Sequence, residues 1–513
     1  MTTAGKEARS KVWVWILVIL LVLVLCCCIT AGGGYLYLNS QGKTIEDALS
    51  GGLLEPQVVV PLPQTMEPLD EGQPPSPAIA TAAPVLMLEG QMVVMASSGV
   101  WTVNENTAEA VQLSSAPLDA PWHPQEGLSP DGQIFAYITG IGGASMNPIL
   151  IALDLAQRVQ ALQLEMTGPL SQPGVEMIPG DPGFEAVRAM EFSNGLAWSP
   201  DGRFLAFSAA MDGDSADVYL YDRRDGAVTR LSNESGHASS LHWSPDGRFI
   251  EYVSVESFGT GAGMAMVGLW AIDMQTREAV MLERLESGGE VFLGWTDGSH
   301  FLIHSWGAAC TAYNMRVVDA SDGAQRVVVD GCFSAAAYNP RDQVGLMSVA
   351  DFNVENCMCG IPLAEAALYA FYLDQEPIPM SRSEVYQIDF LPKGNVFAFQ
   401  PVDEPYAVYD AFGTVLVVPP EVAGLKPFPA SPDGYWAWYR PLLSDDGGEL
   451  WVTLNNEKPV LLTSSSSGKP AWSDDGQTLY YLEDKTLFKA SAPDFVPVAV
   501  PGVTGELLDV VNG

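Results

Sequence analysis

A turn motif that recurs along this chain constrains its fold more than any other feature. An aromatic residue, Ser-Pro-Asp-Gly and an apolar stretch follow one another at Trp198–Ser208 and again, almost unchanged, at Trp243–Ile250. Proline presets φ at the second turn position, serine and aspartate oxygens bond nearby backbone N–H groups, and glycine accepts a left-handed conformation. The stretch after the turn is apolar on nearly every residue, which predicts a strand that is buried on both faces.

The motif returns along the chain at a nearly regular spacing. Another copy begins at Leu128. Weaker copies begin at Trp295, Tyr338 and Phe390, and two more begin at Ala430 and Trp472. A period of about 40–50 residues with several short strands in each unit is typical of a β-propeller. The motif residues that we expect to be structural are Trp198, Pro200, Asp201, Gly202, Trp243, Pro245, Asp246, Gly247, Trp472 and Gly476.

A second landmark supports the same register. In each unit a later strand ends in Asp or Asn before a hairpin, as at Asp222 and Asn104. Asn104 indicates that residues 85–115 form a unit whose opening strand is missing, and the apolar stretch Glu506–Val511 can supply it. A ring closed in this way leaves no exposed edge strand. We therefore predict an all-β fold with one β-propeller of about eight blades, or nine if every unit is a blade.

These residues resemble the TolB-like, WD40-like (PD40) propeller repeats, whose pattern is the same aromatic-Ser-Pro-Asp-Gly turn and a later strand ending in Asp. The resemblance covers about residues 85–513 and is closest at 198–231 and 243–280. It implies a propeller. It says little about function, because the residues that carry it serve turns and packing.

The N-terminal residues predict a membrane anchor. Basic residues precede 12–31, a run without charge that is long enough to cross a bilayer as a helix. The basic flank predicts that residues 1–11 lie in the cytoplasm, so that the chain is a single-pass protein of the cell membrane. Residues 32–84 are rich in Pro and are expected to form an extended stalk, with the propeller at 85–513 outside the cytoplasm. A cleaved signal peptide, or acylation near Cys26, is the alternative.

Charge and cysteines limit the partners and the compartment. The formal net charge of −38 argues against binding nucleic acid, whose phosphates require a basic surface. Outside the cytoplasm disulfides are allowed, and four cysteines permit three pairings that sequence cannot distinguish. The cysteines concerned are Cys310, Cys332, Cys357 and Cys359.

Few residues indicate chemistry. The chain has no Gly-x-Ser-x-Gly and no histidine after His304, which excludes a serine hydrolase of the prolyl-oligopeptidase type. His300 and His304 flank a predicted strand and would stand about 13 Å apart, too far for one metal ion. Asp212, Asp214 and Asp217 place carboxylate oxygens at intervals along a short hairpin, which makes them a candidate calcium site. The alternative is an ordinary polar hairpin. We predict no catalytic residue, no cofactor and no other metal.

The function that these observations favour is binding, because propeller loops are well placed for recognition. We predict a non-catalytic scaffold, not an enzyme, whose partner is an unidentified protein or peptide. The largest departures from the repeat, Gly168–Asn194 and Asp351–Ala367, are expected to form or border the partner surface, so that deleting residues 171–187 should leave the fold intact. The alternatives are a Tol-like envelope-associated module and a glycan-active enzyme with its site at the central channel.

Overall fold

The computed structural model describes residues 91–511 apart from internal gaps, the longest being 116–126, 141–146, 169–180, 258–263, 350–365 and 441–447. The described residues belong to a compact unit, 77–513. The predicted cytoplasmic tip, membrane helix and stalk lie outside the described residues. Within the described part, no helix is both long enough and apolar enough to cross a membrane.

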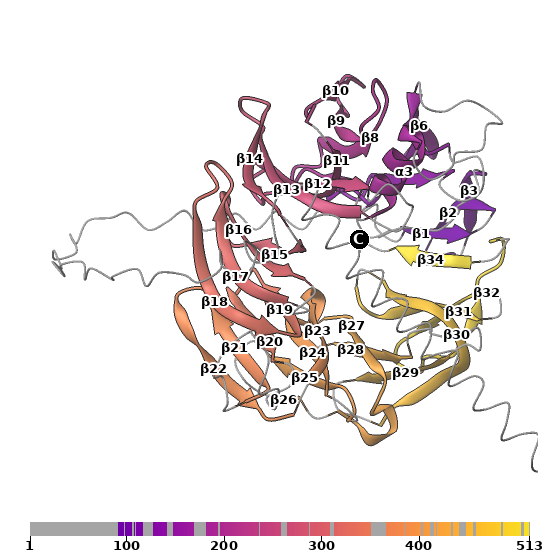
Figure 1. Ribbon diagram of the computed structural model, residues 1–513. Coiled ribbons are helices and arrows are strands. Elements are labelled where there is room, and N and C mark those ends of the chain that lie inside the picture. The colour runs from indigo at the N-terminus through magenta and orange to yellow at the C-terminus, as the bar shows by residue number, and fades with distance from the viewer. Residues whose placement is uncertain are drawn as a thin grey trace, which may run out of the picture. The chain divides into compact units, whose positions relative to one another are not determined.

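The described residues are mostly β-strands arranged in antiparallel sheets, in which strands adjacent in sequence pair with one another (Figure 1). The first sheet contains β34 (Leu507–Val511), β1 (Gln91–Ala96), β2 (Gly99–Asn104) and β3 (Ala110–Ser114). The second contains β4 (Ile134–Thr139), β5 (Ile149–Asp154) and β6 (Val159–Glu165). The third contains β7 (Leu196–Trp198), β8 (Phe204–Ala209), β9 (Asp217–Asp222) and β10 (Val228–Arg230). The fourth contains β11 (His237–Trp243), β12 (Phe249–Ser257), β13 (Met264–Asp273) and β14 (Glu278–Arg284).

The same pattern continues through the second half of the chain. The fifth sheet contains β15 (Gly289–Trp295), β16 (His300–Trp306), β17 (Ala312–Asp319) and β18 (Gln325–Phe333). The sixth contains β19 (Ala335–Asn339), β20 (Val344–Ser348), β21 (Leu368–Tyr372) and β22 (Gln375–Ser381). The seventh contains β23 (Val385–Leu391), β24 (Val396–Pro401), β25 (Ala407–Asp410) and β26 (Val415–Leu416), with η3 (Pro392–Gly394) in its first turn and η4 (Pro420–Val422) after its last strand.

The last sheet has seven strands because one of them is shared. It contains β27 (Lys426–Pro429), β28 (Tyr435–Tyr439), β29 (Gly448–Leu454), β30 (Val460–Trp472), β31 (Thr478–Glu483), β32 (Thr486–Ser491) and β33 (Val498–Ala499). The long strand β30 pairs with β29 along its first part and with β31 along its last part. It therefore belongs to two successive repeat units.

The two ends of the described chain meet in one sheet. Strand β34 pairs antiparallel with β1, as Val93 opposite Val511 and Val94 opposite Val510 show. The predicted closure by the C-terminal stretch is therefore confirmed. Apolar clusters also join each sheet to the next, and one cluster packs β1 and β2 against β31. The sheets thus form a closed ring with their first strands toward its middle (Figure 1), an arrangement consistent with a β-propeller.

The repeated turn is stabilised by the residues that define it. Ser199 Oγ donates to Asp201 Oδ1 at 2.6 Å and accepts the Phe204 N–H at 2.9 Å. Gly202 has φ of +66°, the left-handed conformation that the motif predicts. The same serine–aspartate bond recurs at Ser129–Asp131, Ser244–Asp246 and Ser473–Asp475. The motif is therefore local turn chemistry that is repeated in four of the units.

Neighbouring units are also joined through the tryptophan of the motif. The indole N–H of Trp198 donates to the Gly127 carbonyl at 3.0 Å, and that of Trp243 donates to the Ala197 carbonyl at 2.9 Å. Trp472 makes the same kind of bond to the carbonyl of Phe428 at 3.0 Å. In each case the acceptor lies on or next to the first strand of the preceding unit. The aromatic residue is thus a cross-link between units.

One insertion contributes to the core, contrary to expectation. The segment Gly168–Asn194 contains α3 (Pro182–Phe192), a helix that the Pro- and Gly-rich sequence did not predict. Ala186 and Val187 on this helix are fully buried, and Ala186 packs in the same cluster as β7 and β8. Deleting residues 171–187 would remove these core side chains, so we now expect the deletion to destabilise the fold, contrary to the sequence-based prediction. Most of the second insertion, at 351–365, lies outside the described residues.

Candidate functional site

One position in the repeat shows where the chain departs from its own pattern. This position directly precedes the motif's first residue, near the end of each unit's first strand. It is Gly or Ala in five units and Pro in a sixth, but His242 and Asp389 occupy it in the other two. The small residues are Gly127, Ala197, Gly294, Ala337 and Ala471. Because the turn chemistry needs no polar side chain here, these two departures are candidates for function.

His242 forms a close pair with a buried carboxylate. It lies on β11 directly opposite Glu251 of β12, and its Nδ1 is 2.7 Å from Glu251 Oε2. The Glu251 side chain is only 2% exposed, whereas that of His242 is 19% exposed. In the preceding unit the corresponding cross-strand pair is Ala197 and Ala206. The fold itself therefore requires neither ionisable group.

Burial and hydrogen bonding oppose each other at Glu251. Removal from water raises the pKa of the Glu251 carboxyl, and the hydrogen bond with His242 acts in the opposite direction. When Glu251 is ionised, His242 Nδ1 donates to it, and Nε2 carries the lone pair of the neutral ring. No group among the described residues hydrogen-bonds this Nε2 atom. This is the arrangement of a general base that is oriented by a carboxylate.

The surroundings of His242 are irregular as well as polar. Its ring stacks on Phe292 of β15, with ring centroids 3.9 Å apart and planes 10° apart. The repeat predicts that Trp295 should donate its indole N–H to the carbonyl of His242, yet Trp295 Nε1 is buried with no partner in the described structure. Both first strands are bulged here, between Ser239 and His242 and between Phe292 and Gly294. Unmade hydrogen bonds and bulges concentrate at functional sites in many proteins.

The other departure, Asp389, also has an ionic partner. Its Oδ2 lies 2.8 Å from Nζ of Lys426, on the first strand of the following unit. Both residues line a cavity of about 550 Å³, together with Lys393 and Lys469. Asp389 thus belongs to a pocket, whereas His242 belongs to an isolated pair.

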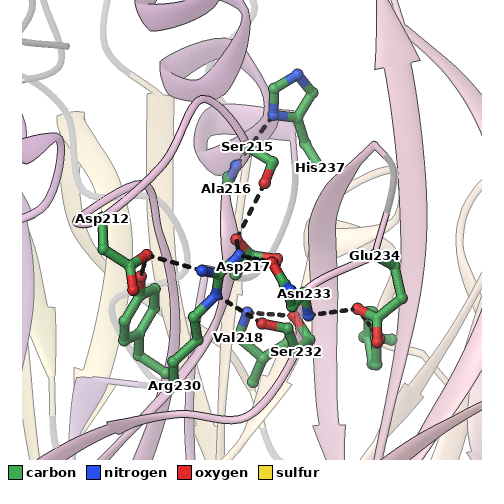
Figure 2. A network of polar contacts seen from close by, with 12 residues as sticks. Asp212, Ser215, Ala216, Asp217, Val218, Arg230, Ser232, Asn233, Glu234 and His237 are labelled. Carbon is green, nitrogen blue, oxygen red and sulfur yellow. Dashed lines mark hydrogen bonds and ion pairs between the residues drawn. The ribbon is translucent and has the colours of Figure 1, made fainter. Parts of the chain in front are cut away.

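Figure 2 shows where the structure places two of the three predicted calcium ligands, Asp212 and Asp217. Arg230 lies between two of them, with Nη2 2.6 Å from Asp217 Oδ2 and Nη1 3.1 Å from Asp212 Oδ1. Burial raises the pKa of Asp217 to about 6, although Arg230 and the Ser215 hydroxyl stabilise its ionised form. In the described chain, no three His, Cys, Asp or Glu side chains are grouped so that they could hold a metal ion. Arg230 is thus the partner of Asp212 and Asp217 in the structure, and calcium binding by Asp212, Asp214 and Asp217 stays a prediction.

The remaining histidines and cysteines have ordinary surroundings where they are described. His237 Nδ1 accepts the Ala216 N–H at 3.1 Å, and burial lowers the pKa of this histidine (Figure 2). His300 contacts Asp297 and Asp319 on the turns of its own unit. Cys332 is disulfide-bonded, and the other cysteines lie outside the described residues, so its pairing stays a prediction.

Comparisons with known proteins support the fold. No family model matches the chain, and no curated protein matches it either. A crystal structure of the eukaryotic initiation factor is similar over 82% of this chain and 98% of its own, with 11% identity and a TM-score of 0.51. An oligogalacturonate lyase in complex with manganese shares 14% identity over 58% of this chain and 88% of its own, with a TM-score of 0.33. Dipeptidyl peptidase 4 of Porphyromonas gingivalis shares 11% identity over 72% of this chain and 58% of its own, with a TM-score of 0.45.

These comparisons correct one sequence-based conclusion and leave another open. A lyase and a peptidase are among the propeller-type structures that resemble this chain, so the inference from a propeller to a non-catalytic scaffold is wrong. Identities of 11–14% show the fold alone and transfer no activity. The propeller expected from the TolB-like resemblance is supported, whereas membership of that particular family stays a prediction.

The sequence carried a signal for the candidate site that the motif search missed. Aligning the units on their aromatic residue places His242 and Asp389 in a column of small residues. The antiparallel register then places Glu251 opposite His242. Comparing the units position by position identifies the pair, whereas a search for known catalytic motifs does not.

Proposed function

We propose that residues 85–513 form a nine-bladed β-propeller that acts as an enzyme, with His242 as its proton-transferring group. The blade count is supported by seven separate sheets and by the last sheet, in which β30 serves two units. Among the described residues the second sheet has three strands, and a bridge between Leu128 and Phe135 occupies the place of a first strand.

The observation that carries the enzymatic proposal is the pair formed by His242 and Glu251. A buried carboxylate beside a partly exposed imidazole orients the ring through its Nδ1 atom. Such a pair fits reactions that begin with removal of a proton, either from a substrate carbon or from an attacking water molecule. His242 is the catalytic residue of this proposal, and Glu251 is a positioning residue.

The location of the enzyme is also part of the proposal. The apolar run at 12–31 and its basic flank support a single membrane anchor, with the propeller outside the cytoplasm. The disulfide at Cys332 fits an oxidising compartment. The acidic composition makes a nucleic acid an unsuitable partner.

The proposal is tested with the full chain and a panel of chromogenic esters, peptides, glycosides and uronic acid oligosaccharides. We expect at least one member of the panel to be turned over, and His242→Asn to reduce kcat/KM by about 100-fold or more. Glu251→Gln should reduce turnover and change the shape of the pH–rate profile, because it alters how the histidine is oriented. Imidazole added to His242→Gly should restore part of the rate.

A matched control separates catalysis from folding. His300→Asn removes another partly exposed histidine that is paired with a carboxylate, but one at the beginning of β16. This variant should keep the full rate. Each variant's Tm is measured alongside, so that a loss of rate is interpreted only for folded protein. No turnover of any panel member, or a rate that survives His242→Asn, would overturn the proposal.

A further inference from the structure

The lysines of this acidic chain are unevenly distributed. Of nine lysines in the sequence, none lies between Lys43 and Lys393, so the propeller holds six, all in its last third. Three of these six line one cavity of about 550 Å³. Half of the propeller lysines of a chain with a net charge of −38 therefore line one cavity.

The cavity is formed where three successive repeat units adjoin. Lys393 lies in η3 directly after β23, Lys426 begins β27, and Lys469 lies in the last part of β30. These segments are, or directly follow, the first strands of their units, which lie toward the middle of the ring in Figure 1. Residues far apart in sequence are therefore brought together by the repeat itself.

The walls between the lysines are largely apolar. Phe428, Tyr439 and Trp472 contribute aromatic surface, and Pro427 and Pro429 contribute rigid apolar surface. The Lys469 ammonium lies 4.8 Å from the centroid of the Phe428 ring, where the ring's electrons attract it. Apolar walls with a few convergent charges are typical of small-molecule sites, and the volume falls in their usual range of about 300–1,000 Å³.

The charges of the cavity select the sign of a ligand. Asp389 is the one carboxylate among the residues that line it, and it is already paired with Lys426. The residues that line the cavity thus carry three ammonium groups and one carboxylate, inside a strongly negative molecule. We propose that this cavity binds a small organic anion, with its carboxylate or phosphate group among the lysines and its apolar body against the aromatic side chains. This site is separate from His242, and the proposal does not depend on the enzymatic one.

Titration calorimetry on the full chain tests the site with three probes that share one apolar body. The probes are 1-naphthoate, 1-naphthyl phosphate and neutral 1-naphthalenemethanol. We expect the anionic probes to bind at least 10-fold more tightly than the alcohol, and their affinity to fall as salt is added. The ratio between the two anions shows which head group the lysines prefer.

Lysine variants show whether the anion binds in this cavity. Lys426→Gln and Lys469→Gln should each weaken naphthoate binding about 10-fold and leave binding of the alcohol nearly unchanged. Lys458→Gln, which alters an exposed lysine that does not line the cavity, is the matched control and should bind as the wild type does. If Lys426→Gln lowers the Tm, then Lys469→Gln, at an exposed position, decides the result. Absence of anion binding, equal affinity for the alcohol, or unchanged affinity in both cavity variants would overturn the proposal.

Discussion

Two neighbouring junctions of the ring are built from the same motif and differ in one cross-link. Where the fourth sheet meets the third, Trp243 donates its indole N–H to the Ala197 carbonyl at 2.9 Å. Where the fifth sheet meets the fourth, Trp295 is equally buried, but no described group accepts its indole N–H. In the repeat, the acceptor for Trp295 would be the backbone carbonyl of His242. At the regular junction the equivalent residue is Ala197, which has no polar side chain. The indole hydrogen bond is therefore absent at the junction that contains the polar pair.

The difference indicates how the fold accommodates a departure from its repeat. The second junction keeps its apolar packing, since Trp295 and Phe301 of the fifth sheet lie in the same buried cluster as Phe249 and Ala271 of the fourth. Apolar packing is non-directional, so it persists when one hydrogen bond is lost. The ring can therefore hold a pair of ionisable groups at one junction while the neighbouring junction keeps its cross-link.

The largest expected effect comes from removing the histidine alone. His242→Ala leaves Glu251 buried without its partner, and we expect unfolding free energy to fall by about 3–5 kcal/mol at pH 7. His242→Ala combined with Glu251→Ala reproduces the Ala197–Ala206 pair of the regular junction and should recover most of that loss. Urea unfolding of the two variants measures both values. A double variant as unstable as the single one would show that the junction needs the pair for folding, and the comparison would fail.

A second buried ionic pair shows whether such a cost is general. Burial raises the pKa of Asp217 to about 6 from its ordinary 3.8. The folded protein then binds this proton more tightly than the unfolded chain does. Unfolding free energy should therefore decrease by about 2–3 kcal/mol through this group as pH rises from about 4 to 6.

Asp217→Asn removes the titrating carboxyl while keeping its size. This variant should lose that part of the pH dependence, and Asp214→Asn, on the exposed part of the same hairpin, should retain it. Urea unfolding between pH 4 and 7 gives the slopes. The opposite result is that the unfolding free energies of the Asp217 variant and the wild type depend on pH with the same slope. That result would mean that Arg230 compensates fully for the burial of Asp217, and that a cost of burial is expected at the His242 pair alone.

The fold was predictable because its signals are local and repeated. Ser199 and Asp201 bond within their own turn, so the motif can be recognised without knowing the tertiary structure. Closure of the ring was predictable from a unit without its first strand. The helix α3 was not predictable, because the burial of Ala186 and Val187 depends on sheets formed elsewhere in the chain.

The candidate site was only partly predictable, for a related reason. His242 and Glu251 are found by aligning the units and applying the antiparallel register. The stacking of His242 on Phe292 depends on how two sheets meet, and no periodicity encodes it. The lysine cavity likewise joins residues from three units, whose convergence follows only from a ring of known order.

The smallest expected effect tests the lost cross-link directly. Trp243→Phe and Trp295→Phe remove the same atoms from equivalent buried positions, so the loss of apolar burial is similar in both. Only Trp243→Phe also leaves the Ala197 carbonyl without its indole donor. We expect Trp243→Phe to be the more destabilising by about 1 kcal/mol, the typical net value of one hydrogen bond. Urea unfolding of both variants, with m-values compared, measures the difference. Equal losses would mean that the indole bond at the regular junction contributes nothing net, and that the polar pair at His242 displaced no stabilising interaction.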